Sequence, residues 1–233
     1  MVDLPGRPSR RSFLKATVAS AAVSSIPLNV AKAKDSSPPP LTDYKPTYFT
    51  AAEWTFVMAA CDRLIPAEGN GPGALETRVP VFIDLQLAGD FGKAATWYMK
   101  GPHKPDADPL LGYQTPLTPA EIYRKAIPVF QDWCQSTHGS AFEKLDADKK
   151  DAALTALQKG AVKLDPELKD FFSLLLENTK EGYFADPIYG GNYKMKAWVH
   201  VGFPGARGSY TEWVKNYNVK YPLGPVSQSG ERA

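Results

Sequence analysis

Cysteine and histidine, the residues that most often hold transition metals, are scarce in this sequence of 233 residues. It contains two cysteines and three histidines, and His103, His138 and His200 lie far apart along the chain. No Cys-x-x-Cys, His-x-x-x-His or Glu-x-x-His spacing occurs, so the common zinc motifs are missing. The Cys-x-x-Cys-His motif is missing as well, which excludes covalent attachment of c-type haem to this chain.

The sequence also lacks an excess of charge of one sign, because 27 basic and 25 acidic residues give a formal net charge of +2. No basic stripe with interleaved aromatic residues is present, so we expect no nucleic acid partner. The glycine-rich run 69–73 contains a proline and follows a predicted helix. It therefore predicts a turn and not a dinucleotide-binding loop, which would follow a strand.

Hydrophobic stretches long enough to cross a bilayer are not found. Residues 16–30 are apolar but rich in Ala and Ser, and they are shorter than the ~20 residues that a membrane helix needs. A pair of arginines and Phe-Leu precede this stretch, and a small-x-small cleavage pattern follows it. This order is typical of a twin-arginine export signal. The residues that carry the prediction are Arg10, Arg11, Phe13, Leu14, Ala31 and Ala33.

Cleavage after Ala33 would place a mature chain in the periplasm. The signal contains five basic residues and one acidic residue, so 22 basic and 24 acidic residues would remain, with a net charge near −2. We expect residues 34–48, which include three consecutive prolines, to be an extended leader after the signal of residues 1–33. Residues 49–233 are expected to form a single helical domain.

Apolar residues recur at helical spacing and do not alternate over any sustained stretch, which predicts an all-α fold. Two predicted helices begin at a capping box, in which Thr50 precedes Glu53 and Thr118 precedes Glu121. We expect an irregular helical domain of about five main helices with long Pro/Gly/aromatic loops. The predicted helices cover residues 50–65, 74–88 (or 79–88), a segment from 118, 146–160 and 165–182, with shorter pieces near 195–199 and 210–216 and a long loop over 89–117.

After export, Cys61 and Cys134 would be in an oxidising compartment. They either form one disulfide or remain two separate thiols buried on apolar helix faces. The sequence leaves both alternatives open.

A tight polar turn between aromatic residues, Asp-Pro-Ile-Tyr-Gly-Gly-Asn, covers residues 186–192. We interpret Asp186 as fixing this turn by accepting backbone N–H hydrogen bonds. The turn and the later motif Gly-Phe-Pro-Gly-Ala at 202–206 resemble motifs of the gluconate 2-dehydrogenase subunit 3 family. Shorter stretches are similar too, so that the resemblance covers most of residues 49–206. These stretches are 49–50, 63–66, 71–74, 82–89 and 101–102.

The resemblance implies a small subunit that has no catalytic residues and binds no cofactor itself. Its partners would be a large flavoprotein of the glucose-methanol-choline type, which holds FAD and oxidises a sugar or sugar acid, and a multihaem cytochrome c subunit with haem c. The small subunit would help the flavoprotein to mature, in a chaperone-like role, and would carry it through the twin-arginine pathway. Contact with the membrane would arise only through the complex.

A complex that survives export needs a large and mostly apolar interface. The density of aromatic residues points to the C-terminal loops, with the loop 97–113 as a second contact. The alternative is that these aromatic side chains only pin their own loops to the helical core. The residues expected in the interface are Tyr183, Phe184, Asp186, Ile188, Tyr189, Asn192, Trp198 and Phe203.

The alternative function is a stand-alone periplasmic enzyme. Its site would need convergent polar groups in a closed pocket, such as His200 with Asp186. A two-lobed solute-binding protein is disfavoured, because the sequence has no α/β pattern.

Overall fold

A capping box begins each of the two helices for which the sequence predicts one. In the computed structural model, which describes residues 38–233, the Thr50 hydroxyl accepts the backbone N–H of Glu53 (3.3 Å). The Glu53 carboxylate in turn accepts the N–H of Thr50 (2.8 Å). Thr118 and Glu121 form the same pair of hydrogen bonds at the same two distances. Because each box satisfies N–H groups that have no partner within the helix, both helix starts are set by local sequence.

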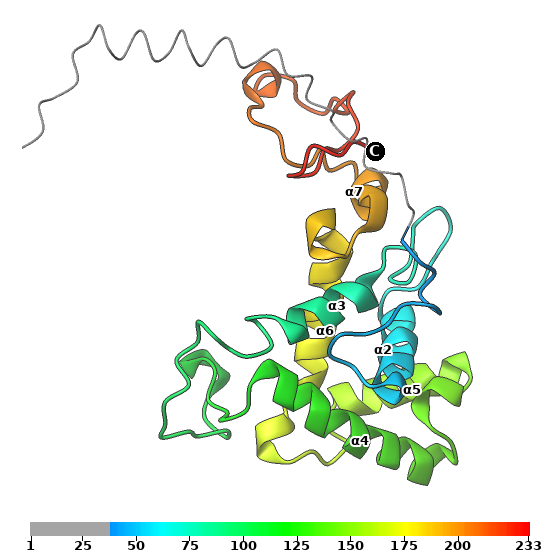
Figure 1. The fold of residues 1–233 in the computed structure, drawn as a ribbon, viewed down its shortest axis with the longest axis vertical. Helices are drawn as coiled ribbons and strands as arrows, with labels where there is room; N and C mark the ends of the chain where they lie inside the picture. Colours follow the sequence, from blue (N-terminus) through cyan, green and yellow to red (C-terminus); the bar gives the residue numbers. More distant parts are fainter. Residues whose placement is uncertain (1–37) are drawn as a thin grey trace, which may run out of the picture. The chain divides into compact units, whose positions relative to one another are not determined.

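Residues 41–233 form one compact unit, in which the helices gather around α6 (Figure 1). Helix α6 contacts α2, α3, α4, α5 and α7. The described residues contain isolated β-bridges but no β-strand, which confirms the all-α prediction. The helices are α2 (Ala51–Leu64), α3 (Val79–Ala88), α4 (Pro119–His138), α5 (Ala147–Gln158), α6 (Phe171–Phe184) and α7 (Lys196–Val201). Short 3₁₀ turns occur at Pro109–Leu111, Phe142–Lys144, Pro166–Leu168, Pro187–Tyr189, Tyr193–Met195 and Thr211–Trp213.

The centre of the core is aromatic. The fully buried rings of Phe56, Phe130 and Phe142 lie with their centroids 5.4 to 5.9 Å apart. Phe171, at the start of α6, stacks on Phe56 at 6.4 Å and meets Tyr123 edge-on at 5.5 Å. These spacings are those of favourable tilted and edge-to-face aromatic pairs. The rings therefore fix the N-terminal half of α6 against α2 and α4.

A buried carboxylate on α3 anchors the chain ahead of α2. Asp84 is fully buried and accepts hydrogen bonds from the Tyr44 hydroxyl (2.9 Å) and from three backbone N–H groups. The backbone donors are Thr47 (2.7 Å), Tyr48 (2.9 Å) and Phe49 (3.0 Å). Several donors of this kind are what makes burial of a carboxylate tolerable. Residues 44–49, most of which fall in the predicted leader, are thus tied to the core.

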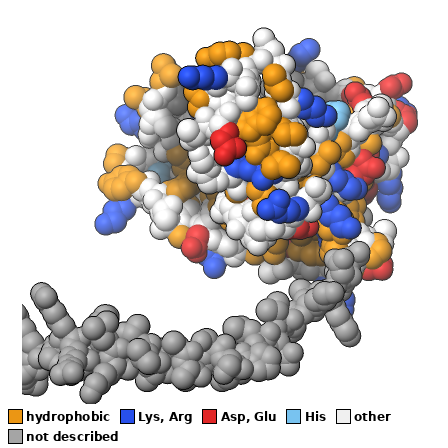
Figure 2. All heavy atoms as spheres, turned by 90° about the horizontal axis from the view of Figure 1, so that it is seen from above, with side chains coloured by type: hydrophobic (Ala, Val, Ile, Leu, Met, Phe, Trp, Pro, Cys, Tyr) orange, Lys and Arg blue, Asp and Glu red, His pale blue; other side chains and the backbone are white. Residues whose placement is uncertain are grey.

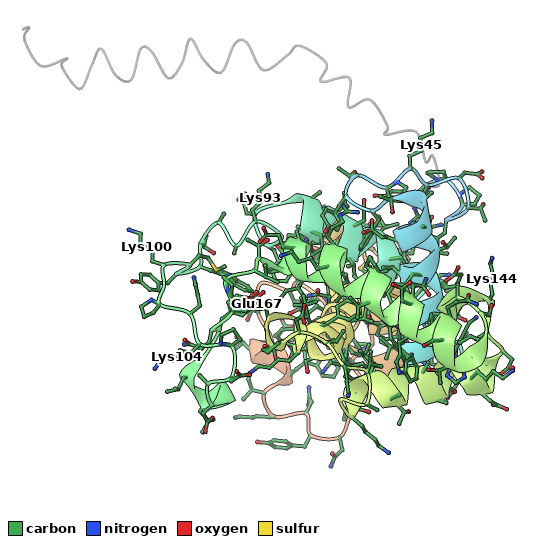
Figure 3. The ribbon with its side chains drawn as sticks, turned by 90° about the horizontal axis from the view of Figure 1, so that it is seen from below. Lys45, Lys93, Lys100, Lys104, Lys144 and Glu167 are labelled. Carbon is green, nitrogen blue, oxygen red and sulfur yellow. The ribbon has the colours of Figure 1, made fainter. Side chains whose placement is uncertain are left out.

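A long segment without α-helix connects α3 to α4, as the sequence predicts for residues 89–117. It projects beside the helices in Figure 1, and Figure 3 shows Lys93, Lys100 and Lys104 pointing outward along it. The Trp97 ring packs edge-on against Tyr113 with centroids 4.8 Å apart. The Thr115 hydroxyl donates to the Glu167 carbonyl at 3.2 Å. The segment is therefore pinned at its base while its tip is open.

Two predicted helix boundaries are wrong, and both involve α6. The predicted start at 165 is a separate 3₁₀ turn, and α6 begins only at Phe171. The predicted end at Gly182 lies inside the helix, which continues to Phe184. Gly182 faces Phe82, and a β-carbon at position 182 would lie 2.8 Å from Cδ1 of that ring. The glycine therefore permits close packing of α6 on α3 and does not end the helix.

The other boundaries agree more closely with the predictions. Helix α3 begins at Val79, the later of its two predicted starts, because a turn occupies 74–78. Helix α7 lies one to two residues beyond its predicted range. The extent of the piece predicted at 210–216 is wrong, because only the 3₁₀ turn Thr211–Trp213 forms there.

None of the helices in the described part of the chain is long and apolar enough to cross a membrane. The predicted signal residues Arg10, Arg11, Phe13, Leu14, Ala31 and Ala33 lie outside the described residues.

Candidate partner-binding surface

The turn after α6 is held by its first and last residues. The Asp186 carboxylate accepts the N–H of Ile188 (3.1 Å), which caps the 3₁₀ turn Pro187–Tyr189, and the N–H of Gln228 (2.7 Å). The sequence-based interpretation of Asp186 as the residue that fixes its own turn is confirmed. The bond to Gln228 was not predicted, and it ties the C-terminal segment to this turn.

Asn192 joins α6, the turn and α7. Its side chain donates to the Ala185 carbonyl (2.9 Å) and accepts the backbone N–H of Ala197 (2.9 Å). Its own N–H donates to the Gly182 carbonyl at 3.0 Å. Asn192 has a positive φ of 42°, a conformation that asparagine tolerates better than most residues. Its buried side chain therefore both donates and accepts a hydrogen bond within the chain.

Trp198 completes this framework from α7. Its indole N–H donates to the carbonyl of Phe184, the last residue of α6, at 2.8 Å. The ring of Phe203 packs edge-on against Trp198, with centroids 5.1 Å apart. A helix-terminal carbonyl and a buried indole N–H thus satisfy each other.

A surface groove of about 680 Å³ lies between this framework and α3. Its walls are mostly apolar, and the two oxygens of Asp186 at its edge are engaged by backbone N–H groups. The groove is lined by Phe82, Gln86, Glu181, Phe184, Ala185, Asp186, Tyr189, Trp198, Phe203, Gly205, Ala206 and Gln228.

The structure divides the eight residues expected in the interface into two sets of four. Phe184, Ile188, Tyr189 and Phe203 are each 46–50% exposed, although their side chains are large and apolar. The other four are buried within the chain, where they hold the surface in place; they are Tyr183, Asp186, Asn192 and Trp198. Only the first set offers side-chain area to a partner.

Leu85 on α3 belongs to the same surface, and the sequence reasoning missed it. It is 41% exposed, and its Cδ1 lies 2.8 Å from where a β-carbon would stand at Gly190. Gly190 has a φ of 91°, so the close approach and the backbone both favour glycine here. The sequence does contain a sign of this surface: α3 is apolar on nearly every face, which is unusual for a helix with a solvent-facing side.

The second expected contact, the loop 97–113, also exposes apolar side chains. Tyr98, Leu110 and Leu111 point largely into solvent, whereas Trp97 and Tyr113 pack against each other. The loop is therefore partly pinned to its own chain and partly free to meet another.

Asp186 and His200, the two polar residues considered for a catalytic site, do not form a common site. Both oxygens of Asp186 accept backbone N–H groups, and His200 lines a different hollow, with Asn70 and Glu76. A β-carbon at Gly71 would lie 3.1 Å from the His200 Nε2 atom, so this ring packs on the glycine turn. Residues 38–233 contain no group of three or more His, Cys, Asp or Glu that could hold a metal ion.

The disulfide alternative for Cys61 and Cys134 is not what the structure contains. Both cysteines are free and buried. The Cys61 sulfur lies 3.7 Å from the Thr179 hydroxyl. Burial raises the pKa of each thiol to about 12, so both remain protonated at neutral pH.

The sequence model of a family described as gluconate 2-dehydrogenase subunit 3 matches residues 51–205. The matched range includes every helix from α2 to α7, the turn 186–192 and most residues that line the groove. No curated protein and no solved structure matches the chain.

Proposed function

This chain belongs to the gluconate 2-dehydrogenase subunit 3 family, and from this we propose that it is the non-catalytic small subunit of a periplasmic FAD-dependent sugar or sugar-acid dehydrogenase. Membership in the family implies partner subunits. The proposed partners are a flavoprotein of the glucose-methanol-choline type, which holds FAD, and a multihaem cytochrome c subunit. In this proposal the chain helps the flavoprotein to mature and carries it through the twin-arginine pathway.

The observation that carries the proposal is the set of half-exposed apolar side chains around the groove. Phe184, Tyr189 and Phe203 line a mostly apolar hollow, Ile188 lies exposed in the adjoining turn Pro187–Tyr189, and Leu85 extends the surface onto α3. Large apolar side chains that gather on a surface are typical of protein interfaces, whose centres are enriched in aromatic residues and depleted of charge. This surface supports binding of a partner with a complementary apolar segment.

The framework beneath these side chains supports tight binding. Asp186, Asn192 and Trp198 fix the turn and α7 through hydrogen bonds to five backbone groups. A surface that is ordered before binding loses less conformational entropy on association. Such an interface suits a complex that has to remain intact while it crosses a membrane.

In this proposal the predicted signal serves to export a flavoprotein that already contains FAD. FAD is inserted in the cytoplasm, so the flavoprotein has to fold before it leaves. The twin-arginine pathway accepts folded proteins, and a tightly bound small subunit can provide the signal for both. Arg10 and Arg11 would then serve two chains.

Co-expression of the full chain with an FAD-dependent oxidoreductase of the proposed type tests both parts of the proposal. We expect the flavoprotein to co-purify with this chain from the periplasm and to show dye-linked dehydrogenase activity, which the chain alone lacks. The double variant Arg10→Lys/Arg11→Lys should leave the flavoprotein in the cytoplasm. Arg7→Lys, outside the arginine pair, is the matched control and should export normally.

The outcomes separate the two parts. Purification of the chain without any flavoprotein would contradict the subunit assignment. A flavoprotein that binds the chain but reaches the periplasm equally well with the double variant would retain the subunit assignment and contradict co-export.

A further inference from the structure

Residues 207–224, here called the C-terminal loop, lie beyond the range that matches the family. The loop is closed at its base. Just outside it, the N–H of Ala206 donates to the Val226 carbonyl at 2.7 Å. Within it, the Arg207 guanidinium donates to the Gly224 carbonyl. The Tyr210 hydroxyl donates to the carbonyl of Gly205, which just precedes the loop, at 3.0 Å. Because its two ends lie close together, residues 207–224 form a compact surface loop and not an extended C-terminal tail.

The loop also has a small interior of its own. The Tyr221 ring lies 5.1 Å from Trp213 and 6.0 Å from Tyr210, both in edge-on geometry. The Arg207 guanidinium stands over the same ring at 5.2 Å. These contacts use the loop's one arginine and three of its aromatic rings, so the loop keeps its shape largely through its own side chains.

The outer side of the loop combines exposed apolar side chains with lysines. Val214, Tyr217, Val219 and Leu223 are 53–80% exposed. Lys215 and Lys220 are exposed between them. Three basic residues and one acidic residue give residues 207–224 a net charge of +2. Figure 2 looks onto the end of the molecule that carries the C-terminal segment in Figure 1, and it shows apolar side chains gathered there with Lys and Arg side chains around them.

In place of the expectation that membrane contact arises only through the complex, we propose that the C-terminal loop itself binds the surface of a bilayer that contains anionic phospholipid. Tyrosine, aliphatic residues and lysine together are the composition of segments that lie at the membrane interface, where the apolar groups enter the headgroup boundary and the ammonium groups remain with the phosphates. Each lysine near an anionic surface adds an attraction of its own.

The composition favours lipid over a protein partner. Lysine is depleted in protein interfaces, whereas arginine is enriched there. In this loop the exposed cations are Lys215 and Lys220, while the single arginine is engaged with Tyr221 and Gly224. The groove differs, because Phe184, Tyr189 and Phe203 line it and no lysine is among its lining residues. The two surfaces are thus suited to two kinds of partner.

A fluorescent label on the loop tests the proposal in the full chain. Cys61 and Cys134 are buried, so a cysteine introduced as Val214→Cys can be labelled selectively with a polarity-sensitive dye. On addition of vesicles of phosphatidylglycerol and phosphatidylcholine we expect a blue shift and brighter emission. Vesicles of phosphatidylcholine alone should give little change. The same dye at Thr155→Cys, an exposed position on α5, should not respond.

Variants that remove the lysine charges provide a second test of the proposal. In the labelled chain, Lys215→Gln/Lys220→Gln should reduce partitioning to the anionic vesicles about 25-fold, since each lysine contributes roughly a factor of five. The matched control, Lys144→Gln/Lys159→Gln, removes the same charge from exposed lysines outside the loop and should have little effect. Higher salt should weaken the wild-type signal.

Three results would overturn the proposal. The first is an unchanged emission at position 214 while the chain sediments with vesicles, since another segment would then make the contact. The second is an equal loss of binding in both lysine double variants, since that would reflect net charge alone. The third is a shift at position 214 produced by the flavoprotein without vesicles, which would assign the loop to a protein interface.

Discussion

The Asp186 carboxylate accepts the backbone N–H of Gln228 at 2.7 Å and thereby joins the turn after α6 to a segment 42 residues later. Its other oxygen accepts the N–H of Ile188 at 3.1 Å. The side chain is only 7% exposed, so water cannot readily replace it as an acceptor. One carboxylate therefore holds both chain segments that border this end of the groove.

We expect Asp186→Ala to lower the free energy of unfolding by about 2 kcal/mol, because two part-buried N–H groups lose a charged acceptor. Limited proteolysis should also release the segment from residue 225 onward sooner than in the wild type. Chemical denaturation and mass spectrometry of the fragments measure the two effects. Asp108→Ala is the control: its carboxylate accepts the Leu110 N–H at 2.9 Å in an exposed loop, so its loss should be within about 0.5 kcal/mol. Equal losses for the two variants would contradict the assigned role of Asp186.

Gly182→Ala should destabilise the protein although alanine is the better helix former. A β-carbon at position 182 would lie 2.8 Å from Cδ1 of Phe82. Overpacking of this kind costs about 1–3 kcal/mol, which exceeds the gain of up to about 1 kcal/mol from replacing glycine within a helix. Gly208→Ala, where the space is open and φ is not positive, should be neutral in the same thermal melt. A stabilised Gly182→Ala would show that α6 and α3 do not pack this closely.

Tyr189→Ala/Phe203→Ala should weaken binding of the flavoprotein by at least about tenfold, since truncated aromatic side chains at the centre of an interface commonly have effects of this size. Gel filtration of the co-expressed proteins measures the released partner. Val129→Ala, at a partly exposed position on α4, should leave the complex intact. Retention of the complex by the double variant, with an unchanged thermal melt, would exclude this surface as the main interface.

The two native cysteines should not react with a thiol reagent at pH 8 until the protein unfolds. Both are buried, and burial raises the pKa of each thiol to about 12, so almost no thiolate is present. Two thiols should become reactive in denaturant, with or without prior reduction. A count that rises only after reduction would reveal a disulfide.

Alkaline pH should destabilise the fold through the ionisation of Cys61 and Tyr44. The pKa of Cys61 is raised to about 12 in the folded state, above the ordinary thiol value of 9.0, and the pKa of Tyr44 rises to about 12 through burial and its bond to Asp84. A raised folded-state pKa gives stability that is complete below the unfolded pKa and declines as pH rises toward the folded one. We therefore expect the free energy of unfolding to fall between pH 9 and 11. The fall should be shallower for Cys61→Ala, and an identical slope would contradict this origin.

Features that depend on near neighbours in the chain were predictable. The capping boxes at Thr50 and Thr118, the cap at Asp146 and the turn fixed by Asp186 all satisfy N–H groups within a few residues of the side chain. The twin-arginine signal is a local pattern of the same kind and stays a prediction here. Gly182 misled the prediction, because a glycine that ends a helix and one that lets two helices touch look the same in sequence.

The sequence by itself determined that this chain is all-α, where most of its helices begin, which family it resembles and that its C-terminal loops are rich in aromatic residues. The tertiary structure decided which of those residues face outward. Phe184 and Tyr183 are neighbours in sequence, yet one is half-exposed and the other donates from its hydroxyl to the Pro72 carbonyl, 111 residues away. The reason is physical: apolar character and hydrogen-bonding groups are properties of a residue, whereas burial depends on which distant segments pack against it. The groove, the hydrogen bond between Asp186 and Gln228, and the hydrogen bonds that tie residues 44–49 to Asp84 all depend on such long-range contacts.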